Sequence, residues 1–206
     1  MERVKVYPLH GGAAGKTGVG IFARELLAAF PLLPVEEEGR LHDPVLRENF
    51  IERVFIMQRW HKLCREGLNP GALVRFHTIH KYLLMAHSPA HYRSMGKLVA
   101  DLRKYPPEDF CRIYFEELMS AMKRHATPSK HQNVLLHILG YFKKDLDPFE
   151  KQELIRLISM YKDALIPLIV PITLLNHYVR KYDKEYLADQ VYLNPHPMEL
   201  KLRNHA

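Results

Sequence analysis

Helical spacing of apolar residues dominates the chain after its first forty residues. Apolar side chains such as Leu46, Phe50 and Val54 recur four positions apart, which places them on one face of an α-helix. Strand-like alternation of apolar and polar residues is confined to residues 3–7 (RVKVY) and 33–37. The pattern therefore predicts a mainly α protein, a bundle of about seven helices, preceded by a short α/β segment of strand, loop, helix and strand.

Proline and capping residues mark the helix starts. A side chain that can accept hydrogen bonds from free backbone N–H groups precedes a proline at five places, namely Asp43, Asn69, Ser88, Thr127 and Asp147. With the start at Pro107, these signals predict helices over 44–66, 70–87, 89–104, 107–125, 128–143 and 148–163, and a last helix over 167–187. We predict two parts, an N-terminal segment of residues 1–42 and an all-helical domain of residues 43–206.

A glycine-rich stretch at residues 10–20 reads HGGAAGKTGVG, and its Gly15-Lys16-Thr17 is similar to the end of a phosphate-binding loop. That loop requires a glycine where this chain has His10. The overlapping dinucleotide-type pattern at 18–23 starts about ten residues after the nearest strand, where a tight turn is needed. We therefore interpret residues 10–20 as a connecting loop.

Positive charge is concentrated in the helical part. The 206 residues carry a formal charge of +7, and residues 1–50 hold 6 Lys and Arg against 7 Asp and Glu, so the excess lies after residue 50. This balance suggests a polyanionic partner. No apolar run has the length of a membrane span, so we expect a cytoplasmic protein without a membrane partner.

Histidine, tyrosine and basic residues gather in three stretches, FHTIHKYLLMAHSPAHYRSMG (76–96), HQNVLLHILGYFKK (131–144) and HYVRKY (177–182). On one continuous helix, His77, His80, Lys81, Leu84 and His87 would share a face. Three interpretations stay open: hydrogen-bonded core histidines, a metal site drawn from helices carrying His77, His87, His137 and His177, or contact with nucleic acid. Because no recognised ligand spacing is present, we predict no metal ligands and no catalytic residues.

The same stretches, with PLIVPITLLNHYVRKY, resemble the YbgA family of all-helical bacterial domains from about Phe50 to Asn204. The segment RVKVYP…GVGIFARELLAAFPLLPVEEEGRL resembles the end of a thiouracil desulfurase (TudS-like) domain. The second resemblance implies removal of sulfur from 4-thiouridine in tRNA with a [4Fe–4S] cluster held by three cysteines. Because the cysteine motif of that family would precede Met1, we expect no cofactor in this chain and a fragment or remnant of a fusion protein.

The first hypothesis is thus a tRNA-binding helical module, the C-terminal part of a tRNA 4-thiouridine desulfurase-type protein. The expected RNA- or ligand-binding residues are His77, Lys81, His87, Ser88, Tyr92, Arg93, His131, Asn133, His137, Tyr141, Lys143, Lys144, His177, Tyr178, Arg180 and Lys181. One alternative is a stand-alone enzyme with a histidine-lined pocket that could bind metal. Another is a structural partner of a desulfurase domain, in cis or in trans.

Overall fold

The N-terminal segment differs from the predicted α/β arrangement. The computed structural model describes residues 3–6 and 15–204; His10 and the rest of the predicted loop up to residue 14 lie outside them. Strand β1 (Arg3–Val6) pairs antiparallel with β2 (Gly15–Val19), so the GKT sequence lies in a strand rather than a loop. Helix α1 (Ile21–Ala29) follows as predicted.

The predicted strand at residues 33–37 is wrong, because that segment is irregular and leads into the 3₁₀ turn η1 (Glu38–His42). Among the described residues, no strand lies beside this segment to pair with its alternating apolar and polar residues. The structure therefore contains a two-stranded hairpin and a helix here, and the α/β remnant is not shown.

Six of the seven predicted helix starts are confirmed, and the last helix begins at Ile169 instead of residue 167. All five side chains before prolines accept a backbone N–H of the following helix, and Asp147 also forms a reciprocal capping box with Glu150. These caps open α2 (Pro44–Glu66), α3 (Pro70–Ile79), α5 (Pro89–Ala100), α7 (Pro128–Leu139) and α8 (Pro148–Lys162). Helix α6 (Pro107–Met122) begins at its proline without a side-chain cap.

After α1, the described residues form ten α-helices, α2 to α11, instead of about seven, because two predicted helices are divided and one further helix follows them. The predicted helix 70–87 breaks at His80 (φ −96°, ψ 3°), which separates α3 from α4 (Lys81–His87). The predicted helix 167–187 becomes α9 (Ile169–Lys181) and α10 (Glu185–Ala188). The short 3₁₀ turns η2 (Leu102–Lys104) and η3 (Gly140–Phe142) form the last part of the predicted helices 89–104 and 128–143. The final elements α11 (Pro197–Lys201) and η4 (Leu202–Asn204) were not predicted.

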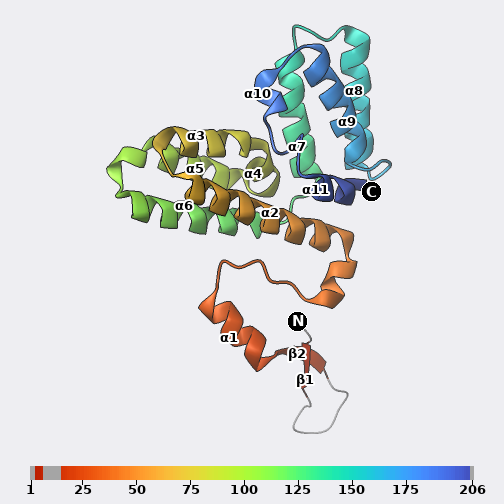
Figure 1. The fold of residues 1–206 in the computed structure, drawn as a ribbon. Helices are drawn as coiled ribbons and strands as arrows, with labels where there is room; N and C mark the ends of the chain where they lie inside the picture. The colour runs from red at the N-terminus through yellow and green to blue at the C-terminus, as the bar shows by residue number, and fades with distance from the viewer. Residues whose placement is uncertain (1–2, 7–14, 205–206) are drawn as a thin grey trace.

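The helices form two groups, α2 to α6 and α7 to α10 (Figure 1). Helix α4, buried over all its residues except Lys81, packs against α7 and joins the groups, and one continuous apolar core runs through both. After α10 the chain returns across the junction, the place where the two helix groups meet, and there the Val191 amide donates to the Ile79 carbonyl at 3.0 Å. The last segment, α11 and η4, packs on α2, so residues near both ends of the helical part meet at the junction.

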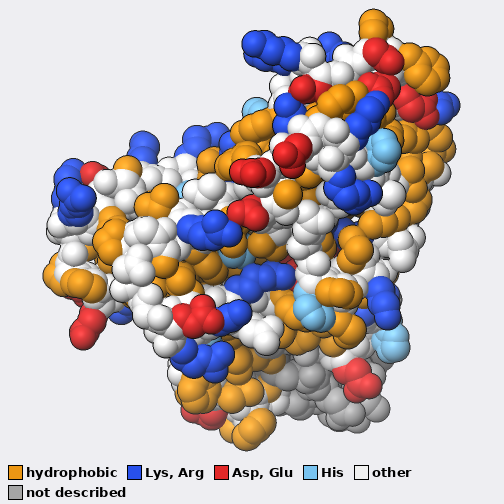
Figure 2. All heavy atoms as spheres, turned by 45° about the horizontal axis from the view of Figure 1, so that its top comes forward, with side chains coloured by type: hydrophobic (Ala, Val, Ile, Leu, Met, Phe, Trp, Pro, Cys, Tyr) orange, Lys and Arg blue, Asp and Glu red, His pale blue; other side chains and the backbone are white. Residues whose placement is uncertain are grey.

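No helix in the described part of the chain has the length and apolar character needed to cross a bilayer. Figure 2 shows Lys and Arg side chains spread over the visible face and interspersed with Asp, Glu and hydrophobic groups. The positive excess is therefore distributed and does not form one continuous patch on that face.

Candidate functional site

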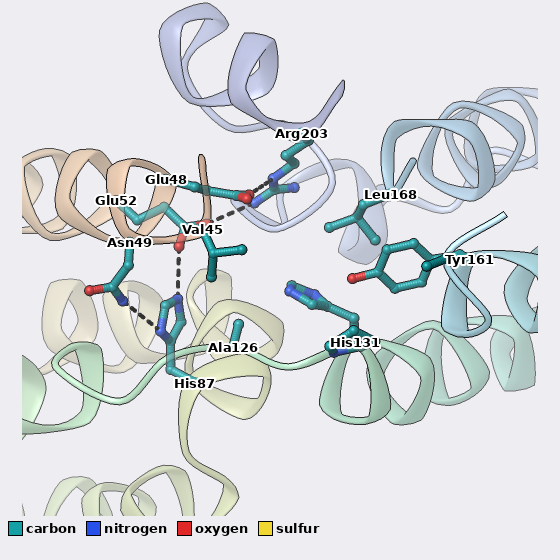
Figure 3. A pocket seen from close by; sticks show the side chains of 12 residues that line it. Val45, Glu48, Asn49, Glu52, His87, Ala126, His131, Tyr161, Leu168 and Arg203 are labelled. Carbon is teal, nitrogen blue, oxygen red and sulfur yellow. Dashed lines mark hydrogen bonds and ion pairs between the residues drawn. The ribbon is translucent and has the colours of Figure 1, made fainter. Parts of the chain in front are cut away.

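A cavity of about 270 Å³ lies at the junction of the two helix groups (Figure 3). Helix α2 contributes Glu48 and Glu52, α4 contributes His87, α7 contributes His131, and η4 contributes Arg203. Other lining side chains are mostly apolar or aromatic, and are Val45, Ala126, Pro128, Tyr161, Ala164 and Leu168, together with Asn49. The cavity thus combines apolar walls with a cluster of charged groups.

Glu52 lies at the centre of the charged cluster. Residues 48 and 52 are four apart on α2, so both carboxyl groups project from the same face of the helix. Oε2 of Glu52 lies 2.9 Å from Nε2 of His87, and Oε1 accepts from Nη2 of Arg203 at 3.2 Å. All three side chains are almost completely buried, so these charged groups interact with each other instead of with water.

His87 is placed between two acceptors. Its Nδ1 lies 2.6 Å from the carbonyl oxygen of Arg124, while its Nε2 faces the Glu52 carboxylate. Since neither oxygen can donate when Glu52 is ionised, the two short contacts match a positively charged ring that donates from both nitrogens, while Nδ2 of Asn49, itself a donor, lies at the longer distance of 3.5 Å from Nδ1. Asn49 borders the same ring and anchors α2 by donating to the carbonyl of Met122 at 2.9 Å.

Arg203 closes the cavity from the C-terminal segment. Its Nη1 donates to the carbonyl of Tyr192 at 2.5 Å, and its Nε lies 3.5 Å from Oε1 of Glu48. Only 1% of the residue is exposed. A fully buried guanidinium fixed in this way holds a permanent positive charge beside the two glutamates.

The two glutamates differ strongly in acidity. Burial raises the pKa of Glu48 from 4.5 to about 8, and the neighbouring charge of Glu52 adds to this effect in spite of Arg203. Burial also acts to raise the pKa of Glu52, but the charge and hydrogen bond of His87 and the charge of Arg203 outweigh it and lower the pKa to about 2. At neutral pH, therefore, Glu52 is ionised and Glu48 holds a proton. Such separated carboxyl pKa values are typical of binding and catalytic sites.

His131 and Tyr161 form the side of the cavity opposite α2. The Nδ1 of His131 lies 2.9 Å from the hydroxyl of Tyr192, and its ring meets the ring of Tyr161 edge-on at 5.9 Å. Burial and then the charge of Arg203 lower the pKa of His131 to about 3, so this ring is neutral. Burial raises the pKa of Tyr161, whose hydroxyl stays protonated.

A second group of interest is a set of four tyrosines on α4, α5, η3 and α10, which we call the tyrosine platform: Tyr82, Tyr92, Tyr141 and Tyr186. The rings of Tyr141 and Tyr186 are stacked at 5.5 Å, and these residues are 42% and 37% exposed. Burial and the neighbouring hydroxyl of Tyr141 raise the pKa of Tyr82 and, to about 12, the pKa of Tyr186. Burial and the charge of Tyr141 likewise raise the pKa of Tyr92.

The structure brings several predicted site residues together, but at two places. His87 and His131 line the cavity. At the tyrosine platform, His77 stacks on Tyr92 at 5.4 Å, and the ammonium group of Lys81 lies 5.0 Å above the ring of Tyr82. The single face predicted for His77 and His87 is wrong, because the break at His80 separates them and they contact different residues.

The other predicted residues divide between surface and structural positions. Exposed residues are Arg93, Asn133, His137, Lys143, Lys144, His177 and Arg180. Ser88 caps α5, Tyr178 is buried against Phe142, and Lys181 is paired with Glu150 at 2.5 Å. These three have structural contacts that account for their presence.

Sequence reasoning missed the residues that complete the cavity. Glu48 and Glu52 have the four-residue spacing of a shared helix face, which was a usable signal. Arg203 and Tyr161 have no such signal, since Arg203 meets Glu52 across 151 positions. Tyr186 of the platform was missed for the same reason, because its stacking partner is Tyr141 on a different element.

The donor groups present can be compared with those that a metal ion or an iron–sulfur cluster requires. Within residues 3–6 and 15–204, no three His, Cys, Asp or Glu side chains are grouped so as to hold a metal ion, and the set His77, His87, His137 and His177 is not assembled. The two cysteines are Cys64, which is exposed, and Cys111, which is partly buried. Two thiols do not fit the three-cysteine set of the iron–sulfur cluster that the desulfurase resemblance implies.

Comparison with known proteins places these features in a family. Residues 81–197 match the model described as "Protein of unknown function (DUF1722)". The chain is 33% identical over 153 residues to "Uncharacterized protein YbgA" of Escherichia coli (strain K12), covering 74% of this chain and 90% of that protein. No solved structure matches. The matched residues include α4, α7 and the tyrosine platform, while Glu48, Glu52 and Arg203 lie outside the span of the family model.

Proposed function

Since the chain belongs to the DUF1722 family, and has the helical junction described above, we propose that it is an RNA-binding module for structured RNA of the tRNA type. The tyrosine platform is the observation that carries this proposal. According to this proposal, the chain recognises RNA, and a desulfurase domain in cis or in trans would supply any sulfur chemistry. The desulfurase relationship rests on the resemblance of residues 1–42 alone.

Exposed stacked tyrosines are suited to unpaired bases. A base can stack on an aromatic ring whatever its sequence, and one such contact contributes about 1–3 kcal/mol. Tyr141 and Tyr186 are parallel within 13° and stay about two-fifths exposed, although a soluble protein usually buries large aromatic rings more fully. The pair therefore offers a ring face or edge to a ligand from solvent.

Basic side chains adjoin the platform in the chain. Lys143 and Lys144 directly follow the η3 turn that holds Tyr141, and Arg93 follows Tyr92 on α5; all three are exposed. Lys81 adds an ammonium group beside Tyr82. Cations next to aromatic groups are the combination that binds a phosphate backbone while bases stack. The formal charge of +7 supports the same polyanionic partner.

The proposal is tested by tRNA binding to the full chain at about 50 and 200 mM salt. Tyr141→Ala should weaken binding about 5- to 150-fold, the equivalent of one base stack. The matched control is Tyr105→Ala, since Tyr105 has a similar exposure of 38% but lies outside the platform. The double change Lys143→Ala with Lys144→Ala should lower affinity and reduce the salt slope by about 0.7–0.9 per lost phosphate contact.

Two results would reject this function. One is absence of tRNA binding at the lower salt concentration by the folded wild-type protein. The other is equal weakening by Tyr141→Ala and Tyr105→Ala, which would mean that the platform does not contact RNA. If tRNA does not bind but a desulfurase domain co-purifies with the chain, the structural-partner alternative replaces this proposal.

A further inference from the structure

The cavity at the helix junction is separate from the tyrosine platform and has features of a small-molecule site. Protein interiors are densely packed, and voids larger than a water molecule are few. The cavity of about 270 Å³ is not such a void, since its lining residue Val45 is 44% exposed, but it reaches from solvent to buried charges on Glu52 and Arg203. It lies close to the lower limit of small-ligand pockets, about 300 Å³.

The charge balance of the cavity favours an anion. Glu52 is negative, whereas His87 and Arg203 are both positive for the reasons given above. Glu48 is partly compensated by Arg203 and holds a proton at neutral pH. The cluster thus carries one net positive charge on side chains that are almost completely buried, where a complementary charge on a ligand is strongly felt.

The polar groups facing the cavity are able to donate hydrogen bonds. A guanidinium has five N–H donors, and the three contacts of Arg203 leave donors in excess. In the described part of the chain, neither the Tyr161 hydroxyl nor Nε2 of His131 has a hydrogen-bond partner, although His131 is only 7% exposed. Figure 3 shows the Tyr161 hydroxyl and the His131 ring directed into the space below Arg203 and Glu48.

Two apolar side chains flank the cavity, Val45 beside Glu48 and Leu168 beside Tyr161 (Figure 3). We propose that this cavity binds a small organic acid, with its carboxylate between Arg203, Tyr161 and His131 and its carbon chain against Val45 and Leu168. Arginine and hydroxyl donors are a common combination for carboxylates. The apolar side chains would select acids with a short apolar body.

Glu48 makes this binding dependent on pH. Below about pH 8 its carboxyl group is protonated and can donate to the bound carboxylate, whereas above that pH it becomes a second negative charge beside it. Affinity should therefore be constant below the pKa and fall about tenfold per pH unit above it. Charged and titratable groups that act on Glu48 are Glu52 on α2, Glu199 on α11, Arg203 on η4, Tyr161 on α8 and Tyr192 in the preceding loop.

The experiment uses three probes of similar shape, n-butyrate, butyramide and n-butylammonium, titrated into the full chain by calorimetry at about pH 6 to 9. Butyrate should bind about tenfold or more tightly than the other two at pH 7, and its affinity should fall above pH 8. Glu48→Gln should retain butyrate binding and lose the decline above pH 8, because glutamine donates but does not ionise. Tyr161→Phe should weaken butyrate about 3- to 10-fold, while Tyr105→Phe should not.

The outcomes separate the alternatives. Preference for butylammonium with affinity that rises with pH would overturn the proposal, as would equal binding of butyrate and butyramide, or no binding of butyrate by folded wild-type protein at about 50 mM. The proposal is supported if the fall in butyrate affinity above pH 8 is lost in Glu48→Gln and in none of the other proteins tested. The site is also independent of RNA binding: Tyr161→Phe should leave tRNA affinity unchanged, and Tyr141→Ala should leave butyrate affinity unchanged.

Discussion

Replacing Glu52 with glutamine tests the central claim about the junction, that one ionised carboxylate holds α2, α4 and the C-terminal segment together. The amide has nearly the same shape as the carboxylate, so packing is preserved. It removes the negative charge between His87 and Arg203, which remain buried. An unpaired buried cation is costly, and the fold should lose stability although no cavity is created.

The size of the loss follows from the acidity of Glu52. Its pKa falls from 4.5 to about 2 on folding, and each tenfold change in acidity corresponds to about 1.4 kcal/mol. Ionised Glu52 thus contributes about 3 kcal/mol to the free energy of unfolding at neutral pH, which agrees with the ~3–5 kcal/mol typical of breaking a buried pair.

Urea unfolding monitored by circular dichroism at several pH values measures this contribution. A lowered carboxyl pKa means that stability is present above about pH 4.5 and is lost as the pH falls toward 2. The difference between wild type and Glu52→Gln should therefore be largest at pH 7 and shrink below pH 4. Glu153→Gln, at an exposed ion pair with Arg156, is the control and should change stability by less than about 0.5 kcal/mol. A Glu52→Gln protein as stable as wild type at pH 7, or a difference independent of pH, would refute the reasoning.

Two further stability predictions concern the helices themselves. Trp60→Ala should cost about 3–5 kcal/mol and lower the melting temperature by about 10 °C, because Trp60 is 3% exposed and stacks on Tyr114 at 5.1 Å. Phe149 is 78% exposed, so Phe149→Ala should change the melting temperature far less. Similar losses of stability in Trp60→Ala and Phe149→Ala would contradict the assigned core. Asp147→Ala should cost about 1 kcal/mol by removing the capping box of α8. Thermal melts compared with Lys151→Ala check this, and equal effects of the two changes would argue against the cap.

Local signals predicted the helix starts well because their chemistry is local. A capping side chain and the N–H groups that it satisfies lie within three residues of each other, as for Asp147 and Glu150. The same reasoning failed at residues 33–37, where alternation was read as a strand. A strand needs a partner, and the chain supplies β1 with β2 instead.

Helix interruptions were not predictable in the same way. The spacing around His80 is compatible with one helix from 70 to 87, yet the chain bends there and the His80 ring nitrogen Nδ1 lies 2.7 Å from the Phe76 carbonyl. This bend places α4 against α7. It also decides why His77 faces the tyrosine platform and His87 faces the cavity.

The amino-acid sequence by itself determined the mainly helical class, the helix starts, the positive balance and the family, since each depends on composition or on residues close together in the chain. Only the tertiary structure decided which polar residues share a site. Glu52, His87 and Arg203 meet across 35 and 151 positions. Burial at that meeting point then separates the acidities of Glu48 and Glu52. No short stretch of sequence contains that information, because desolvation arises from what the rest of the fold places around a side chain.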